Sequence, residues 1–377
     1  MSLTDLHIEF YRSVRNLRLP VRRLTVLVGA NGVGKTNIYR GLELVRAAAT
    51  GDLAMSIARE GGLASVLWAG HRRVTEGPRL CLEVGLDMDG PEKNAAFLPR
   101  YRVEIGFGDA KYQAVFAEEP QIKIESLVLP GRRAVTLLER KGPAGWYRDD
   151  SGARRQFEDP LLASETALSA VRGTVPELDA VRHLLANWRF YHGFRTDQDA
   201  PLRRPALAVT APLLDADGGN LAAVFATLTH IRGDTLELDA AIDAAFPGAK
   251  LVVPPPGKTA EFSLVFPDLP NRPFGAGELS DGTLQFLALL GALLSYRLPP
   301  LIALNEPEAS LHPDLLPALA RAIAKAAERT QVWVVTHSQI LADAIADQTG
   351  IVPRTAIRKD GGTSILGLSE LGIFADE

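Results

Sequence analysis

The sequence is poor in cysteine and in net charge, and it has no long apolar run. Its 377 residues include one cysteine, Cys81, which cannot form an intramolecular disulfide, so we expect a reducing, cytoplasmic location. The longest apolar stretch, 286–294, is too short to cross a bilayer, and residues 1–6 lack the basic flank and apolar core of a secretion signal. We therefore predict no association with a membrane.

Two further features narrow the class of protein. The net charge of -4 argues against a chain that coats nucleic acid without specificity, although a local basic patch is compatible with it. The sequence has no repeat, low-complexity tract or long heptad array, which excludes a long coiled-coil arm. The hydrophobic content of 46% supports a large core, and the length predicts one elaborated domain with an insertion or two closely packed lobes.

The most informative motif present is a phosphate-binding loop. The apolar run 24–28 leads into Gly-Ala-Asn-Gly-Val-Gly-Lys-Thr at 29–36, followed by a predicted helix over about 37–45. Glycines let successive backbone N–H groups face a β-phosphate, Lys35 reaches the β- and γ-phosphate oxygens, and the Thr36 hydroxyl binds Mg²⁺. The residues predicted to contact a nucleoside triphosphate are Gly29, Asn31, Gly32, Val33, Gly34, Lys35, Thr36 and Asn37.

The spacing of apolar residues changes along the chain. Short strands are predicted at 7–11 and 17–19 with Asn16 at the turn between them, and alternation over 80–148 predicts an antiparallel meander. From 176 the period is helical, and beyond 257 short apolar strands alternate with helices, as a parallel sheet requires. We predict an ATPase core over 1–75 and 265–377, an antiparallel β subdomain over 76–150 and a helical lobe over 151–264.

Three later segments carry polar residues where a ligand would bind. The strand-like run 301–304 ends in Asn305 and Glu306, a carboxylate suited to orient the water that attacks a γ-phosphate, and the run 331–335 leads to His337. Ser280 and Gly282 begin an apolar helix, whose N-terminus is a second anion site. Each segment also has a plainer interpretation, as a solvated glutamate, a structural histidine or an ordinary capped helix.

Taken in order, these motifs resemble the ABC-type ATPases of the RecF/SMC branch, in a compact form without a long coiled coil. The resemblance implies an α/β P-loop head with a mixed sheet, an antiparallel β subdomain and a helical lobe. It implies the use of ATP and Mg²⁺ and a slow, dimerisation-dependent hydrolysis. It also implies that two ATP-bound copies pair head to tail, so that Ser280 and Gly282 of one copy contact the γ-phosphate held by Lys35 of the other.

The same resemblance implies roles for single residues. Thr36 and Asn305 would lie at Mg²⁺, Glu306 would act as general base, His337 would sense the γ-phosphate and Arg12 would lie near the nucleotide. The acidic residue that the family places before the catalytic glutamate is Asn305 here, and we identify no glutamine that completes the metal coordination. Because an amide supplies no negative charge, we expect weaker Mg²⁺ binding and slow turnover.

Two biological roles stay open. The first is a homodimer that closes over double-stranded DNA in repair or recombination. The alternative is a nucleotide-gated switch in a defence or regulatory complex, in which a separate effector protein acts, since the roughly forty residues after 337 are too few for a nuclease domain. Basic and aromatic residues that would grip DNA, or form a solvated face balanced by Asp149 and Asp150, are Arg132, Arg133, Arg140, Lys141, Trp146, Tyr147, Arg148, Arg154 and Arg155.

Overall fold

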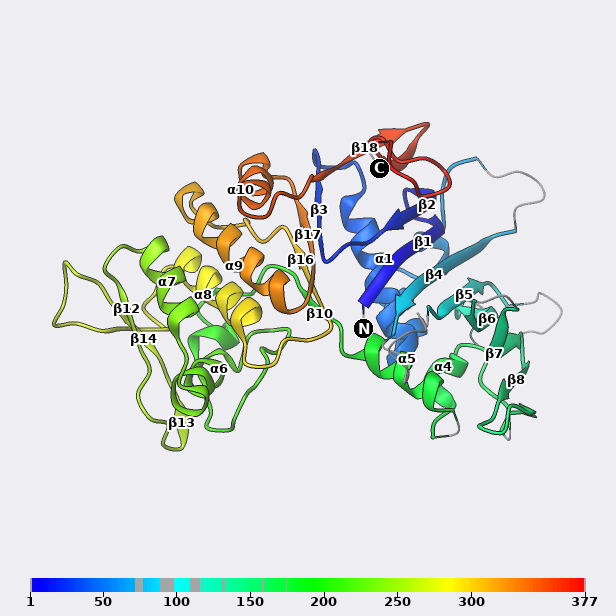
Figure 1. The fold of residues 1–377 in the computed structure, drawn as a ribbon, viewed down its shortest axis with the longest axis horizontal. Coiled ribbons are helices and arrows are strands. Elements are labelled where there is room, and N and C mark those ends of the chain that lie inside the picture. The colour runs from blue at the N-terminus through cyan, green and yellow to red at the C-terminus, as the bar shows by residue number, and fades with distance from the viewer. Residues whose placement is uncertain are drawn as a thin grey trace. The chain divides into compact units, whose positions relative to one another are not determined.

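The structure is a computed structural model that describes residues 2–71, 77–88, 98–108, 116, 118–130, 133–157, 159–173 and 175–375. The chain forms two units (Figure 1). The first comprises Met1–Arg22, Ala30–Trp188 and Thr355–Glu377, and the second comprises Arg23–Gly29 and Arg189–Arg354. The division into a core, a β subdomain and a helical lobe stays a prediction, and its boundary near residue 75 lies outside the described residues.

An antiparallel sheet dominates the first unit, because alternating apolar residues leave one face of each strand to bury. In the described part of the chain its strands lie in the order β2-β1-β4-β5-β6-β7-β8-β9, which confirms the predicted meander. The strands of this sheet are β1 (Ser2–Tyr11), β2 (Val14–Pro20), β4 (Arg79–Asp87), β5 (Arg100–Gly106), β6 (Gln121–Leu129), β7 (Val135–Lys141), β8 (Ala144–Arg148) and β9 (Arg154–Gln156). A hairpin outside this sheet, near residue 360, consists of β18 (Arg354–Lys359) and β19 (Gly362–Ile365).

The helices of this unit are α1 (Lys35–Thr50), α2 (Leu53–Arg59), α3 (Leu63–Val66), α4 (Ala167–Ala170) and α5 (Pro176–Ala186). Helix α1 packs on the sheet beside β1 and β4 (Figure 1). A Cβ added at Gly41 would lie 2.4 Å from Cδ1 of Ile8, so glycine is what permits this close approach. The helix that follows the phosphate-binding loop is thereby fixed to the N-terminal strands.

The first hairpin corrects one predicted turn. Strand β1 continues to Tyr11, which pairs with Val14, so the turn is made by residues 12 and 13. Asn16, which we predicted at the turn, lies inside β2 opposite Glu9. Its Oδ1 lies 2.9 Å from Nε2 of His7, so the side chain that suggested a turn serves a cross-strand contact instead.

A parallel sheet dominates the second unit. Strands β10, β16, β17 and β3 lie in this order and run parallel, and all residues of β3 and β17 are buried. Burial on both faces explains why these runs are continuously apolar rather than alternating. The strands of this unit are β3 (Leu24–Val28), β10 (Arg189–Tyr191), β11 (Ala206–Leu207), β12 (Lys250–Val252), β13 (Thr259–Ala260), β14 (Ser263–Val265), β15 (Phe274–Gly275), β16 (Leu301–Asn305) and β17 (Gln331–Thr336).

Helices pack around this sheet and around one another (Figure 1). Helix α8 is buried from Leu284 to Leu294, which accounts for the longest apolar run of the sequence. The helical segments are η1 (Pro201–Arg203), α6 (Leu221–Ala226), the π-helix η2 (Thr227–Arg232), α7 (Leu236–Ala245), α8 (Asp281–Leu294), η3 (Pro313–Leu315), α9 (Leu316–Arg329) and α10 (Gln339–Thr349). Among the described helices, none combines the length and the apolar character that a bilayer crossing requires.

Candidate functional site

The phosphate-binding loop curls back on itself in the way its glycines permit. Gly32 and Gly34 have φ angles of 80° and 98°, a left-handed conformation that side chains with a Cβ rarely adopt. Lys35, the first residue of α1, is buried and its Nζ donates to the carbonyl of Ala30 at 2.9 Å. The N-cap of α1 is Gly34, which has no side chain to cap the helix, so the positive end of α1 is open to an anion.

A hairpin from the end of the chain supports this loop. Thr363 of β19 donates through Oγ1 to the carbonyl of Val33 at 2.8 Å and lies 2.6 Å from Oγ of Ser13. The Asn37 side chain donates to the same Ser13 hydroxyl at 2.6 Å. A Cβ at Gly34 would lie 1.9 Å from Oγ1 of Thr363, so a larger residue there would displace the support.

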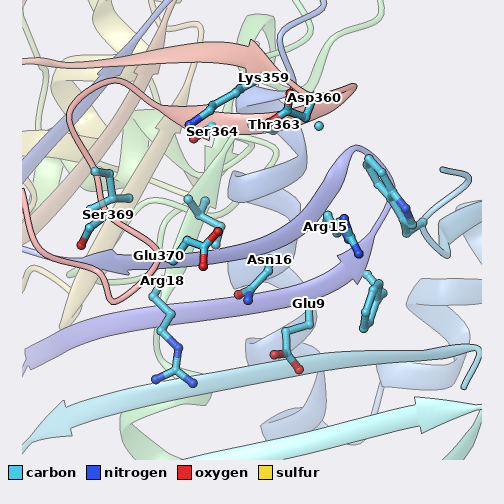
Figure 2. A pocket seen from close by; sticks show the side chains of 15 residues that line it. Glu9, Arg15, Asn16, Arg18, Lys359, Asp360, Thr363, Ser364, Ser369 and Glu370 are labelled. Atoms are coloured by element: carbon cyan, nitrogen blue, oxygen red, sulfur yellow. The ribbon is translucent and has the colours of Figure 1, made fainter. Parts of the chain in front are cut away.

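Behind Thr363 lies a polar cleft of about 500 Å³. Figure 2 shows Arg15, Asn16 and Arg18 on one side of it and the β18–β19 hairpin with Lys359 and Asp360 on the other. The cleft therefore lies between the first hairpin of the chain and its C-terminal hairpin, the two elements that hold the phosphate-binding loop.

In the second unit, three neighbouring parallel strands end at the predicted site residues. Val28, the last residue of β3, is opposite Thr336 of β17, and Asn305, the last residue of β16, is opposite Val335. The carboxyl ends of parallel strands meet at one edge of a sheet. The start of the phosphate-binding loop, Glu306 and His337 therefore follow directly from the ends of β3, β16 and β17.

At this edge the two predicted catalytic residues lie close together, with a third residue beneath them. Nδ1 of His337 is 3.9 Å from Oε1 of Glu306 but only 2.9 Å from Oε1 of Glu308. The Glu306 side chain is 37% exposed and its backbone has a φ angle of 50°, so the carboxylate is presented to solvent on a strained turn. Glu308 is buried, and its Oε1 also accepts hydrogen bonds from Thr336 and Ser338.

The end of β16 offers one candidate ligand for Mg²⁺. Oδ1 of Asn305 is buried and has no hydrogen-bond partner among the described residues, so an acceptor is available there. No group of three or more histidine, cysteine or acidic residues within the described chain could hold a metal by itself. Mg²⁺ keeps several waters and is bound together with substrate phosphates, which one amide oxygen could complement. The role of Thr36 at the metal stays a prediction.

Ser280 and Gly282, which we predicted as a second anion site, lie at the start of α8. Ser280 is the N-cap of α8, is exposed, and its Oγ accepts from the backbone N–H of Thr283 at 3.2 Å. A Cβ at Gly282 would lie 2.8 Å from the carbonyl oxygen of Ser310, so this helix start packs tightly against the loop that follows β16. A hydroxyl is thus presented at the positive end of a long helix.

Arg203 holds the segment before α8 in place. Its Nη1 donates to the carbonyls of Ala276, Gly277 and Leu279 at 3.3, 3.2 and 2.8 Å, and its Nη2 lies 2.6 Å from Oδ1 of Asp281. The Arg203 side chain is 12% exposed. One guanidinium therefore binds the backbone before Ser280 and the side chain of the residue after it.

Arg12 has a carboxylate partner in the structure. Its Nε and Nη2 donate to Oε2 of Glu60 at 2.8 and 2.6 Å, and the Tyr11 hydroxyl donates to the same oxygen at 2.7 Å. Burial alone would lower the pKa of Arg12, but the hydrogen bonds and charge of Glu60 and Tyr11 outweigh it and raise that pKa. The role of Arg12 near the nucleotide stays a prediction.

Arg140, which we predicted among the residues that would grip DNA or form a solvated face, does not lie on the surface. This residue is completely buried, and its guanidinium donates to the carbonyls of Gly142, Leu162 and Glu165, so it cannot reach a phosphate. The sequence marked it only by its charge and its neighbour Lys141.

Two exposed cations of this region, Arg154 and Arg155, have partners within the protein. Nε of Arg155 donates to Asp149 at 2.7 Å, and the Arg154 guanidinium lies 4.2 Å from the ring centre of Trp146. These contacts favour the alternative of a charge-balanced sheet face. Arg132 lies outside the described residues.

Sequence reasoning missed Glu308, Arg203 and Thr363. Glu308 is two positions after a predicted catalytic residue, but nothing in a loop sequence indicates that a carboxylate is buried. Thr363 contacts Val33 across more than three hundred residues of chain, a proximity for which a single sequence holds no signal. Arg203 lies far from the segment it binds, with no motif around it.

Comparison with known proteins identifies the family. Residues 24–343 match AAA_21, described as "AAA domain, putative AbiEii toxin, Type IV TA system". The chain belongs to the AAA_21 family. No curated protein matches this AAA_21 chain.

Solved structures show the fold that the AAA_21 chain shares. An SMC head bound to the C-terminal winged-helix domain of ScpA has a TM-score of 0.52 and 15% identity, over 98% of each chain. An SMC head with an extended coiled coil, bound to the C-terminal domain of ScpA derived from Pyrococcus furiosus, has a TM-score of 0.50 and 14% identity, over 98% of this chain and 96% of that one. The predicted fold class, an α/β P-loop ATPase head of the SMC/RecF type, is confirmed.

Proposed function

We propose that this AAA_21 protein binds ATP with Mg²⁺ and hydrolyses it slowly, at sites that two copies of the chain complete together. The observation that supports this most is the sheet edge at which β3, β16 and β17 end in the phosphate-binding loop, Glu306 and His337. Glu306 takes a proton from the attacking water and His337 contacts the γ-phosphate, giving ADP and phosphate. Thr36 and Asn305 would bind Mg²⁺, which would supply charge neutralisation for the phosphates when present.

The dimer follows from the position of Ser280. This hydroxyl is exposed at the start of α8, and in the proposal it contacts the γ-phosphate that the partner copy holds with Lys35. Hydrolysis then removes the group that joins the two copies. Turnover is slow because Asn305 supplies a hydrogen bond but no charge at the metal.

The test uses four variants, nucleotide binding and light scattering after size-exclusion chromatography. Glu306→Gln is expected to bind ATP, lose at least about 100-fold in turnover and accumulate as a dimer. Lys35→Ala is expected to lose ATP binding and remain monomeric. Ser280→Asp keeps an N-cap acceptor but repels a phosphate, so it should bind ATP without dimerising, whereas Ser280→Thr, the matched control, should dimerise.

Rapid hydrolysis by a monomer would contradict the proposal. So would an ATP-bound Glu306→Gln protein that stays monomeric over a concentration series. Dimerisation of Ser280→Asp at wild-type affinity would show that the paired surfaces lie elsewhere.

We propose that the ATP-bound dimer acts on double-stranded DNA in repair or recombination, as the resemblance to the RecF/SMC branch suggests. The test is hydrolysis and binding with a 40-base-pair duplex over a salt series. Stimulated hydrolysis and ATP-strengthened binding that weakens as salt rises would support this role.

A second candidate is a nucleotide-gated switch for an effector protein. The toxin and type IV TA description of the family favours it, as does the burial of Arg140, which removes one cation from the predicted DNA-binding surface. A duplex without effect on hydrolysis, together with a partner that leaves after turnover, would favour the switch over DNA.

A further inference from the structure

Glu308 fixes the turn that follows β17 through a single oxygen. Its Oε1 accepts from Oγ1 of Thr336 at 2.6 Å and from the backbone N–H groups of His337 and Ser338 at 2.9 and 3.2 Å. The same oxygen lies 2.9 Å from Nδ1 of His337. Because Glu308 belongs to the loop after β16, it joins the end of one strand to the end of the next.

These contacts determine how the His337 ring is presented. Of the two ring nitrogens of His337, Nδ1 is the one that faces Glu308, at 2.9 Å from Oε1. Nε2 is then the ring nitrogen available to a ligand. The His337 side chain is 43% exposed, and Glu308 is the contact that restricts its rotation.

The other oxygen of Glu308 argues against a purely structural role. Oε2 is buried and has no hydrogen-bond partner among the described residues, and the Glu308 side chain is only 5% exposed. A buried carboxylate with one bare oxygen carries a desolvation cost that an apolar residue would avoid. The buried Glu308 therefore fixes the orientation of the His337 ring at a cost in folding stability.

We propose that Glu308 is a positioning residue for ATP hydrolysis, which acts by holding the His337 imidazole with Nδ1 engaged and Nε2 available. The proposal rests on the hydrolysis proposed above. It assigns to Glu308 no contact with ATP, metal or the attacking water, because Oε1 already accepts from the Thr336 hydroxyl and two backbone N–H groups and Oε2 is buried.

A double-mutant cycle on kcat tests whether Glu308 acts through His337. Glu308→Ala in the wild-type background is expected to lower kcat by about 10- to 100-fold with KM for ATP within about three-fold, because orientation rather than binding is lost. In a His337→Ala background the same substitution should change kcat by less than about two-fold. An equal loss in both backgrounds would show that Glu308 acts independently of His337 and would overturn the proposal.

The Glu308→Gln variant tests whether the hydrogen bonds accepted by Oε1, rather than the negative charge, are what matters for kcat. The glutamine Oε1 can accept the same bonds, so this variant should keep kcat within about three-fold of wild type. A loss as large as that of Glu308→Ala would overturn the proposal. Glu125→Gln is the matched control, because Glu125 is another buried carboxylate that accepts two backbone N–H groups; it should lower the melting temperature and leave kcat unchanged.

A spectroscopic measurement tests the geometry without any hydrolysis. In protein with ¹⁵N-labelled histidine, the ring correlations of His337, assigned by their loss in His337→Gln, should show a hydrogen on Nδ1 in the nucleotide-free wild type. Glu308→Ala should remove this signature. A wild-type ring without hydrogen on Nδ1 would refute the positioning role, whereas a wild type with this signature and no ATPase activity would refute only the proposed hydrolysis.

Discussion

Two buried carboxylates, one in each unit, are bound in nearly the same way. Glu125 of β6 accepts from the backbone N–H groups of Ala167 and Leu168 and from the Tyr101 hydroxyl, and Glu308 accepts from two adjacent backbone N–H groups and the Thr336 hydroxyl. Glu125 binds the first residues of α4, and Glu308 binds the residues that follow β17. One difference is that Glu125 uses both of its oxygens, whereas Oε2 of Glu308 has no partner among the described residues.

The side chains near the two carboxylates also differ. Burial raises the pKa of Glu125 and the charge of Arg140 opposes that rise, and Arg140 is as completely buried as Glu125 itself, so neither is open to a ligand. The partner of Glu308 is His337, a half-exposed ring with a second nitrogen to offer. A buried carboxylate is therefore more indicative of a functional site when the side chain it contacts reaches solvent. When the neighbouring side chain is buried too, the carboxylate is better explained as part of the fold.

Replacing Arg140, the buried cation near Glu125, should have the largest effect on stability. Arg140→Met leaves Glu125 buried without a compensating charge, so we expect a loss of about 3 to 5 kcal/mol in the free energy of unfolding, with ATP binding retained. Urea unfolding followed by circular dichroism measures it. Arg133→Met, an exposed neighbour, is the control, and a loss below about 1 kcal/mol for Arg140→Met would remove the distinction between the two carboxylates.

The same variant should show a defined pH dependence. Burial already raises the pKa of Glu125 above its ordinary value of 4.5, despite its backbone hydrogen bonds, and loss of Arg140 raises it further. A raised folded-state pKa means that the stabilising contribution is present below pH 4.5 and lost as pH rises through the folded-state value. The destabilisation of Arg140→Met should therefore shrink as pH falls, and a constant difference across pH 4 to 8 would exclude Glu125 as its cause.

A third prediction concerns Arg203, a cation that binds the segment around Ser280, where the two copies are proposed to meet. Arg203→Met frees the backbone before Ser280 and the Asp281 side chain after it, so we expect ATP-dependent dimerisation to weaken about ten-fold, or about 1.4 kcal/mol. Analytical ultracentrifugation in the Glu306→Gln background measures it. Arg204→Met is the neighbouring control, because that side chain is exposed and pairs only with the exposed Asp199 among the described residues. Equal effects of the two substitutions would show that the contacts of Arg203 do not matter.

The smallest expected effect concerns Cys81 in the antiparallel sheet. Burial raises the pKa of its thiol well above the ordinary value, so the reactive thiolate is suppressed. Alkylation by iodoacetamide at pH 8 should be at least about ten-fold slower in the native protein than in urea. Fast alkylation of Cys81 in the native protein would mean that the antiparallel sheet opens readily. That result would contradict the view that Glu125 and Arg140 are inaccessible to ligands.

The parts of this molecule that the sequence predicts well are those in which neighbouring residues carry the signal. The glycine-rich loop, the β3, β16 and β17 runs and the Ser280 cap each lie within a few residues, and the structure confirms their local geometry. The meander from β4 to β9 is predictable for the same reason, since alternation is a local pattern.

The parts that escaped prediction depend on distant residues. The basic appearance of Arg140 conceals a side chain whose three carbonyl partners come from the 142–165 segment. The burial of Glu308 depends on a turn that begins twenty-eight residues later, at Thr336. Asn16 was misplaced because β2 begins at Val14 rather than at residue 17, so the turn is completed before Asn16.

The bond between Thr363 and Val33 has a consequence for biosynthesis. The loop that would grip phosphate is made early in translation, but its support is encoded 330 residues later. A nascent chain therefore lacks this brace until Thr363 has been synthesised and has emerged, and a product cut short before that residue has an unsupported loop.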